Sequence, residues 1–295
     1  MEELERLKRD IKNAKELQSL VKIMKTISAV SIHEYEQAVE SLIEYNKTIE
    51  MGFQIIMKNR INDLPIVNPI EKKKRLGAVI FGSEQGLCGN FNGQIARFAV
   101  EKLRELEHES QIAVAVGERV IGSLDEAGLP IEANFSFSGN PAGITQVMLE
   151  LLVKIEEWRS VGEIDQIILF FNGPISGSSF KPQMIYLYPL DMDWLNRLSE
   201  EKWPSRSLPT FSMNTDRLFS SLVRHYLFFS LYRAFIESLA SENASRLASM
   251  QMAEKNLEEH LSELQIQFNR QRQTAITSEL LDIMTGFEAL TGVPN

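Results

Sequence analysis

The sequence has little of what most catalytic or secreted proteins depend on. It contains one cysteine, Cys88, so no internal disulfide can form and no redox compartment is implied. Its histidines are scattered, with no pair at the spacing of metal ligands, at His33, His108, His225 and His260. No run approaches the ~18 consecutive apolar residues of a membrane-spanning helix. These absences predict a soluble protein, or one held at a membrane only by its partners.

The charge balance excludes another class of function. The chain has 31 Lys plus Arg against 40 Asp plus Glu, a formal net charge of −9. Nucleic-acid binding is therefore not expected, because phosphate contacts need clustered basic side chains. Apolar residues make up 44% of the 295 residues, which is enough for a folded core, and the length suggests about two domains.

Glycine and proline are nearly absent from both ends of the chain. Thirteen of the 16 glycines lie within residues 77–177, and nine of the ten prolines lie within residues 65–209. The first 64 residues contain only Gly52, and residues 210–285 contain neither type. Glycine costs about 1 kcal/mol and proline about 3 kcal/mol inside a helix. The sequence thus predicts a long helix in residues 1–64, an α/β domain in residues 65–209, and a second long helix in residues 210–295.

The two flanking segments carry coiled-coil patterns. In the first, apolar or small residues alternate at spacings of three and four. They are Leu17, Val21, Met24, Ser28, Ser31, Tyr35, Ala38, Leu42, Tyr45 and Ile49. In the second, the corresponding run is Leu257, Leu261, Leu264 and Phe268. Helices of this length cannot be buried by the middle domain, so we expect an antiparallel coiled coil whose remaining apolar surface is covered by another protein.

A second apolar stripe strengthens that expectation. It lies beside the first pattern, is interleaved with Lys22 and Lys25, and consists of Leu20, Ile23, Ile27 and Val30. A helix that is apolar over most of its circumference is buried on more than one side. An enclosing partner is therefore at least as good an interpretation as a solvated helix.

The middle region alternates strand and helix patterns. Apolar runs predict strands at residues 75–83, 111–117, 163–174 and 183–189. Helical patterns fall between them, at residues 91–109, 118–127 and 143–159. Such alternation is typical of a mostly parallel, Rossmann-like sheet with helices on its faces. We therefore expect this α/β domain to be inserted between the two long helices.

The glycine loop at residues 82–90, between the first strand and the next helix, is the strongest local motif. It includes Gly86, Cys88 and Gly89, but it matches neither G-x-G-x-x-G nor G-x-x-x-x-G-K-[ST]. Cys88 could have a lowered pKa near a helix N-terminus, yet His108, the one histidine of the domain, lies at the far end of the predicted helix. We expect a tight turn of unknown role, with no catalytic residue, cofactor or metal.

Four stretches resemble the γ subunit of F-type ATP synthases, and the resemblance spans nearly the whole chain. Residues 20–30, LVKIMKTISAV, are similar to the family's I-T-K-A-M-x-M-V-A-A. Residues 83–92, SEQGLCGNFN, are similar to S-D-x-G-L-C-G-G-x-N. Residues 240–250, ASENASRLASM, resemble A-S-E-x-x-A-R-M-x-A-M. Residues 268–286, FNRQRQTAITSELLDIMTG, resemble Y-N-x-x-R-Q-x-x-I-T-x-E-L-x-E-I-x-x-G.

The resemblance implies a central-stalk rotor with no active site of its own. In that family the two helices turn inside a ring of α and β subunits, while the α/β domain meets the ε subunit and the c-subunit ring. The resemblance places Lys22, Met24, Lys25 and Arg246 near the β-subunit lever. It places Arg272, Gln273, Thr277, Glu279 and Asp282 at the upper contacts with β. It also implies a peripheral protein on the cytoplasmic face of the plasma membrane, or on a thylakoid membrane in a photosynthetic source.

Three departures from the family pattern predict a divergent branch, such as a second-copy or ion-specialised synthase. Asn90 replaces the second glycine of G-L-C-G-G, Phe287 follows Gly286 in place of alanine, and His33 stands near the expected lysine. Two other functions remain open from the residues alone. One is an α/β enzyme whose helical arms form a dimer, and the other is a coiled-coil scaffold unrelated to rotary motors.

Overall fold

The computed structural model describes residues 2–59, 75–137, 141–160, 162, 164–175, 179–203 and 211–291. The chain divides into two compact units. The first, here the coil unit, comprises Met1–Ile27 and Leu247–Asn295. The second, here the domain unit, comprises Ser28–Arg246. Each unit is described separately below.

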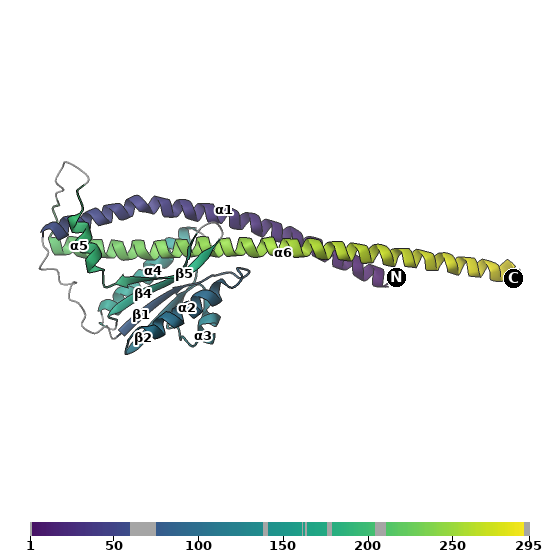
Figure 1. The fold of residues 1–295 in the computed structure, drawn as a ribbon, viewed down its shortest axis with the longest axis horizontal. Coiled ribbons are helices and arrows are strands. Elements are labelled where there is room, and N and C mark those ends of the chain that lie inside the picture. Colours follow the sequence, from purple (N-terminus) through teal and green to yellow (C-terminus); the bar gives the residue numbers. More distant parts are fainter. Residues whose placement is uncertain are drawn as a thin grey trace. The chain divides into compact units, whose positions relative to one another are not determined.

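Two long helices, α1 (Glu2–Asn59) and α6 (Thr215–Thr291), confirm the prediction from glycine and proline placement (Figure 1). Asn214 caps the start of α6, because its Oδ1 atom accepts a hydrogen bond from the Asp216 amide at 3.0 Å. Residues 60–64, which the sequence assigns to the first helix, lie outside the described residues.

Within each unit the two helices run antiparallel. In the coil unit Glu3 accepts a hydrogen bond from Gln271, and Lys25 pairs with Glu254. In the domain unit the Tyr45 hydroxyl lies 2.8 Å from the Nδ1 atom of His225. Further along α1, the Phe53 ring lies 5.8 Å from the Phe219 ring. In both units the partners on α6 thus move toward its N-terminus as α1 advances, which confirms the expected antiparallel pairing.

The domain unit contains a five-stranded sheet in the order β3-β2-β1-β4-β5. Its strands are β1 (Arg75–Phe81), β2 (Ser110–Val116), β3 (Ala133–Phe135), β4 (Gln166–Pro174) and β5 (Phe180–Tyr188). β1, β2, β3 and β4 are parallel, and β5 pairs antiparallel with β4. The prediction of a mostly parallel sheet is therefore confirmed.

Four shorter helices complete the domain unit: α2 (Phe91–Glu105), α3 (Arg119–Glu126), α4 (Pro141–Ser160) and α5 (Met192–Glu200). The first three match the predicted helical stretches. α2 ends four residues earlier than expected, because Leu106 takes an extended conformation and β2 begins at Ser110. Neither α5 nor β3 was predicted from the sequence.

Alternate residues of the strands enter two separate cores. Ala78 and Ile80 of β1 face the core beneath α2 and α3, whereas Val79 and Phe81 face the core beneath α4 and α6. Within the domain unit, Figure 1 shows α2 and α3 on one side of the sheet and α6 on the other. The ring of Phe235 on α6 lies 5.6 Å from that of Phe81, so the sheet packs directly on this helix.

Candidate functional site

The glycine loop lies at the carboxyl end of β1, where it turns into α2. Two of its residues take left-handed backbone conformations, Leu87 with φ 63° and Gly89 with φ 58°. Among the described residues, Leu87 is the single non-glycine residue with positive φ, and its side chain is 60% exposed. An apolar residue in this conformation is strained by about 1–2 kcal/mol, so the surrounding contacts must hold it there.

Side chains of the loop and of the first turn of α2 fix the beginning of the loop. The Asn92 Oδ1 atom accepts a hydrogen bond from the Ser83 amide at 2.9 Å, and Asn92 Nδ2 donates to Ser83 Oγ at 2.8 Å. The Ser83 hydroxyl donates in turn to the Gln85 carbonyl at 2.9 Å. Glu84 accepts from the amide of Glu118, which precedes α3, and from that of Phe137, which follows β3, and so connects the loop to both elements.

Two adjacent residues of α6 bind the carbonyls of the same loop. The Ser245 hydroxyl donates to the Cys88 carbonyl at 2.6 Å. The Nη2 atom of Arg246 donates to the carbonyls of Gln85 and Gly86, each at 3.3 Å. Arg246 was expected from the resemblance to lie near a partner's lever, and the glycine loop had no assigned role. In the structure Arg246 and the glycine loop are in direct contact.

Arg246 is also the centre of a buried ion pair. Its Nη2 atom lies 2.6 Å from Glu242 Oε1, and the two side chains are only 8% and 6% exposed. Burial raises the pKa of the Glu242 carboxyl above its usual value, although Arg246 acts in the opposite direction. Asn243 Oδ1 accepts a further bond from Arg246 Nη1 at 3.3 Å. The guanidinium therefore has acceptors on both α6 and the loop.

The pKa of Cys88 is shifted in the opposite direction to the one that a helix N-terminus would favour. The thiol is 2% exposed, and burial raises its pKa. Its Sγ atom donates to Ser83 Oγ at 3.5 Å, whereas His108 contacts the Leu106 carbonyl beyond the end of α2. Because the thiolate is the reactive form, this geometry argues against a nucleophilic role. Within the described ranges no group of three or more histidine, cysteine or acidic residues could hold a metal ion.

The expected contact residues on α1 differ in how they are held. Lys22 is exposed and Met24 is half-buried. Lys25 pairs with Glu254 of α6 within the coil unit, and the two side chains are 34% and 16% exposed. Sequence reasoning did not identify this cross-helix pair, because the two residues belong to distant segments. Lys22 is therefore more accessible to a partner than Lys25.

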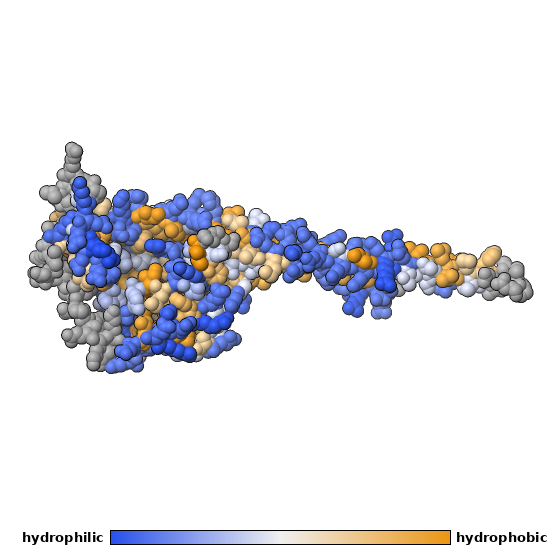
Figure 2. Space-filling model, viewed as in Figure 1, coloured by the Kyte–Doolittle hydropathy of each residue, from blue (hydrophilic) through white to orange (hydrophobic). Residues whose placement is uncertain are grey.

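The expected upper contact residues all lie on the surface of the coil unit. The exposed residues are Arg272, Gln273, Thr277, Glu279 and Asp282. Between them α6 presents apolar side chains that are 47–68% exposed: Ile276, Leu280, Leu281, Ile283, Met284 and Phe287. Figure 2 shows this hydrophobic surface along the C-terminal part of α6. On α1, Leu20, Ile23 and Ile27 are 56–59% exposed. These surfaces suit burial against another protein.

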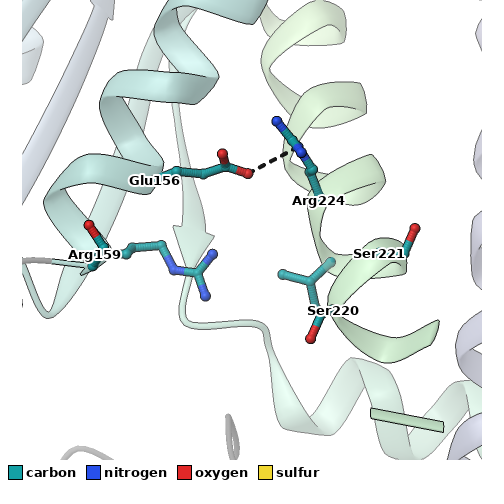
Figure 3. Close-up of a pocket in the computed structure, with 7 residues that line it drawn as sticks. Glu156, Arg159, Ser220, Ser221 and Arg224 are labelled. Carbon is teal, nitrogen blue, oxygen red and sulfur yellow. Dashed lines mark ion pairs between the residues drawn. The ribbon is translucent and has the colours of Figure 1, made fainter. Parts of the chain in front are cut away.

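One further groove, of about 550 Å³, lies between α4 and α6 in the domain unit (Figure 3). Arg224 Nε lies 3.1 Å from Glu156 Oε1 across it. The guanidinium of Arg159 stacks on the Tyr188 ring at 4.6 Å. Ser220 and the other lining residues come from separate helices, and no sequence pattern had connected them. The lining contains no histidine or cysteine.

The fold and its surfaces define a class of protein in which an α/β domain is inserted between two long antiparallel helices. Both helices carry exposed apolar side chains that suit burial against another protein. The chain belongs to the ATP synthase family, whose profile matches residues 3–290. It is 28% identical over 289 residues to the ATP synthase gamma chain of Heliobacterium modesticaldum, which covers 96% of this chain and 98% of that protein. It is 29% identical over 288 residues to the gamma chain of Histophilus somni, which covers 95% and 96% respectively. The predicted family is thus confirmed.

Solved structures share the fold. A chain of the Euglena gracilis mitochondrial ATP synthase, solved with OSCP, F1 and the c-ring, has a TM-score of 0.61 at 17% identity and covers 99% of this chain and 97% of its own. A chain of the Tetrahymena thermophila mitochondrial ATP synthase, from its central stalk and c-ring, has a TM-score of 0.54 at 19% identity. It covers 79% of this chain and 99% of its own. Over the described residues, no helix is both long enough and apolar enough to cross a membrane.

Proposed function

We propose that this chain is the central-stalk γ subunit of an F-type ATP synthase and turns within a ring of α and β subunits. The observation that carries the proposal is the family match over residues 3–290, since it spans both long helices and the α/β domain. The exposed apolar surfaces of the coil unit support it, because a rotor shaft is covered by the ring. The ε subunit and the c-ring are the further partners we assign to the α/β domain.

The function follows from shape rather than from a catalytic group of the chain's own. A shaft that contacts each β subunit differently stabilises a different conformation in each, and hence a different affinity for nucleotide. Ion flow through the membrane would turn the shaft and cycle those conformations, and ATP hydrolysis would turn it in reverse. The complex would hold the chain at the cytoplasmic face of the plasma membrane, or at a thylakoid membrane in a photosynthetic source.

We assign two sets of contacts with β, both in the coil unit. Lys22 and Met24 would meet the β lever, with Lys25 held in place by Glu254. The second set comprises Arg272, Gln273, Thr277, Glu279 and Asp282, whose exposure leaves them accessible. Exposed ion pairs contribute at most about 1 kcal/mol each, so such contacts can break and re-form at every step. Arg246 would act through the glycine loop rather than by direct exposure.

Co-expression tests the proposal directly. The tagged chain would be produced with the α and β subunits of its own source and purified on the tag. Three α and three β subunits per copy, with ATP hydrolysis that depends on this chain, are expected. A lone chain or a self-dimer, beside well-folded α and β, would contradict the rotor function and favour a scaffold.

A point variant then tests the lever contact. Met24→Lys adds a charge beside Lys22 and should lower the number of ions pumped per ATP hydrolysed while assembly is retained. Met252→Lys is the matched control, since Met252 is 68% exposed in the same unit and outside the assigned contacts. Equal coupling in the two variants would refute the assignment of Met24.

A further inference from the structure

We propose that Ser245 and Arg246 form a latch that fastens the glycine loop to α6, and that this latch is the joint through which the α/β domain and α6 turn together. This inference rests on the proposed function. It assigns the two residues a positioning role within the subunit, distinct from contact with β.

The latch binds three backbone carbonyls of the loop, two before Leu87 and one after it. Arg246 reaches the carbonyls of Gln85 and Gly86, and Ser245 reaches that of Cys88 at 2.6 Å. These bonds bracket Leu87, the residue that holds a strained left-handed conformation. Backbone acceptors on both sides of Leu87 are therefore fixed from outside the loop, which accounts for how the strained turn is maintained.

The other side of the loop is fixed to the α/β domain. Glu84 accepts from the Glu118 amide at 3.2 Å, just before α3, and from the Phe137 amide at 3.4 Å, after β3. Asn92, in the first turn of α2, makes two hydrogen bonds with Ser83. The loop is thus held by the domain at one end and by α6 at the other. A force applied to the domain passes to the helix through these few bonds as well as through apolar packing.

The charged group of the latch is buried, which makes partial opening of the contact unfavourable. Arg246 is 7% exposed, and the loop carbonyls and Glu242 are its acceptors. If the loop moved away, the guanidinium would lose the Gln85 and Gly86 carbonyls and keep Glu242 and Asn243 as acceptors. Loss of hydrogen bonds from a charged donor is costly, so the closed loop is favoured over a loosened one. Apolar packing such as that of Phe81 on Phe235 can slide, whereas this directional pairing cannot.

The single cysteine of the chain supplies a local probe of the latch. Because Cys88 is 2% exposed and its carbonyl is bound by Ser245, reaction of its thiol requires the loop to open. Arg246→Ala and the milder Ser245→Ala should each raise the rate of maleimide labelling by about tenfold or more, because each deletes a partner of a buried network. Labelling of the Cys88 peptide would be followed by mass spectrometry in the full chain and in the assembled complex.

A closely matched control lies on the same helix. Arg233 and Glu237 form an ion pair at 2.7 Å with the same i,i+4 spacing as Glu242 and Arg246 but with the opposite order of charges. Arg233→Ala removes a pair of the same spacing whose arginine side chain is 54% exposed and does not contact the loop, so it should leave Cys88 labelling at the wild-type rate. Labelling of the two latch variants at the wild-type rate would overturn the latch.

Coupling separates a torque joint from a merely structural contact. In membrane vesicles, Ser245→Ala and Arg246→Ala should pump fewer ions per ATP hydrolysed, with Arg233→Ala unchanged. Faster labelling with unchanged coupling would overturn the role of the latch as a joint. If the wild-type chain failed to assemble with α and β, the proposed function itself would fail. Failure of the proposed function can be told apart from failure of the latch, because the labelling experiment on the full chain does not require assembly.

Discussion

Gly82, where β1 passes into the glycine loop, is expected to tolerate no side chain. A Cβ atom built on Gly82 would lie 2.2 Å from the Cβ of Val120, and 2.6 and 2.9 Å from its two γ carbons. Carbon atoms pack at about 3.5–4.0 Å, so the closest pair would be more than ~1 Å too near. Val120 is fully buried in the first turn of α3, and its Cβ cannot move without the helix backbone.

Gly82→Ala should therefore destabilise the domain unit by about 3 kcal/mol, the upper part of the range for overpacked cores. Relief requires α3 to move away from β1, and the Arg119 amide at the start of α3 donates to the Ser83 carbonyl at 3.0 Å, which resists that movement. Gly122→Ala is the matched control. Gly122 lies in the exposed part of α3 with nothing within 4 Å of an added Cβ, so alanine should stabilise the helix by about 1 kcal/mol.

Urea unfolding followed by tryptophan fluorescence would measure both variants, because all three tryptophans, Trp158, Trp194 and Trp203, belong to the domain unit. A value for Gly82→Ala within 1 kcal/mol of wild type would refute the reasoning, since about 3 kcal/mol is expected. A second outcome is equally decisive. Val120→Ala keeps the colliding Cβ, so it should fail to restore the stability of the Gly82→Ala chain, and full rescue would show that the clash has been misplaced.

Three further predictions concern other parts of the chain. Phe53→Ala should cost about 3–5 kcal/mol in urea unfolding, because a fully buried ring is removed, and a loss below ~1 kcal/mol would contradict this. The pKa of Glu242 is raised by burial above its usual 4.5, so its contribution to stability is present below that value and is lost as the pH rises. The stability of Glu242→Gln relative to wild type should therefore increase from about pH 4.5 toward neutrality, and parallel pH profiles would refute it. A double-mutant cycle on Lys25 and Glu254 should give about 0.5–1 kcal/mol of coupling that falls with added salt, and salt-independent coupling would contradict a partly exposed ion pair.

The long helices and the sheet could be predicted because they depend on local, repeated patterns. Helix breakers are missing from 1–51 and 210–285, which marks α1 and α6. Continuous apolar runs mark the buried strands β1, β2 and β4, whose fully buried faces need no alternation. The domain boundaries at residues 64 and 209 remain a prediction.

Two elements were missed for different reasons. β3 has three residues, of which none is fully buried, so it carries neither an apolar run nor a measurable alternation. α5 did carry a signal, since the Asp191 side chain accepts from the Asp193 amide as an N-cap and Leu195 and Leu198 are buried. At nine residues it is short, and the proline-rich surroundings obscured that signal.

The candidate site was harder to predict than the fold because backbone groups provide much of it. The sequence indicates a tight turn from Gly86 and Gly89, but it cannot indicate that the carbonyls of Gln85, Gly86 and Cys88 point at α6, since every residue type has a carbonyl. The family resemblance placed Arg246 near the β-subunit lever, and its residue type gives no sign of burial, because arginine is seldom buried. Its acceptors lie about 160 positions earlier in the chain, where helical periodicity carries no information. Only the folded arrangement shows that the charge has partners within the chain, on the loop and on α6, while the expected contact of Arg246 with the β lever stays a prediction.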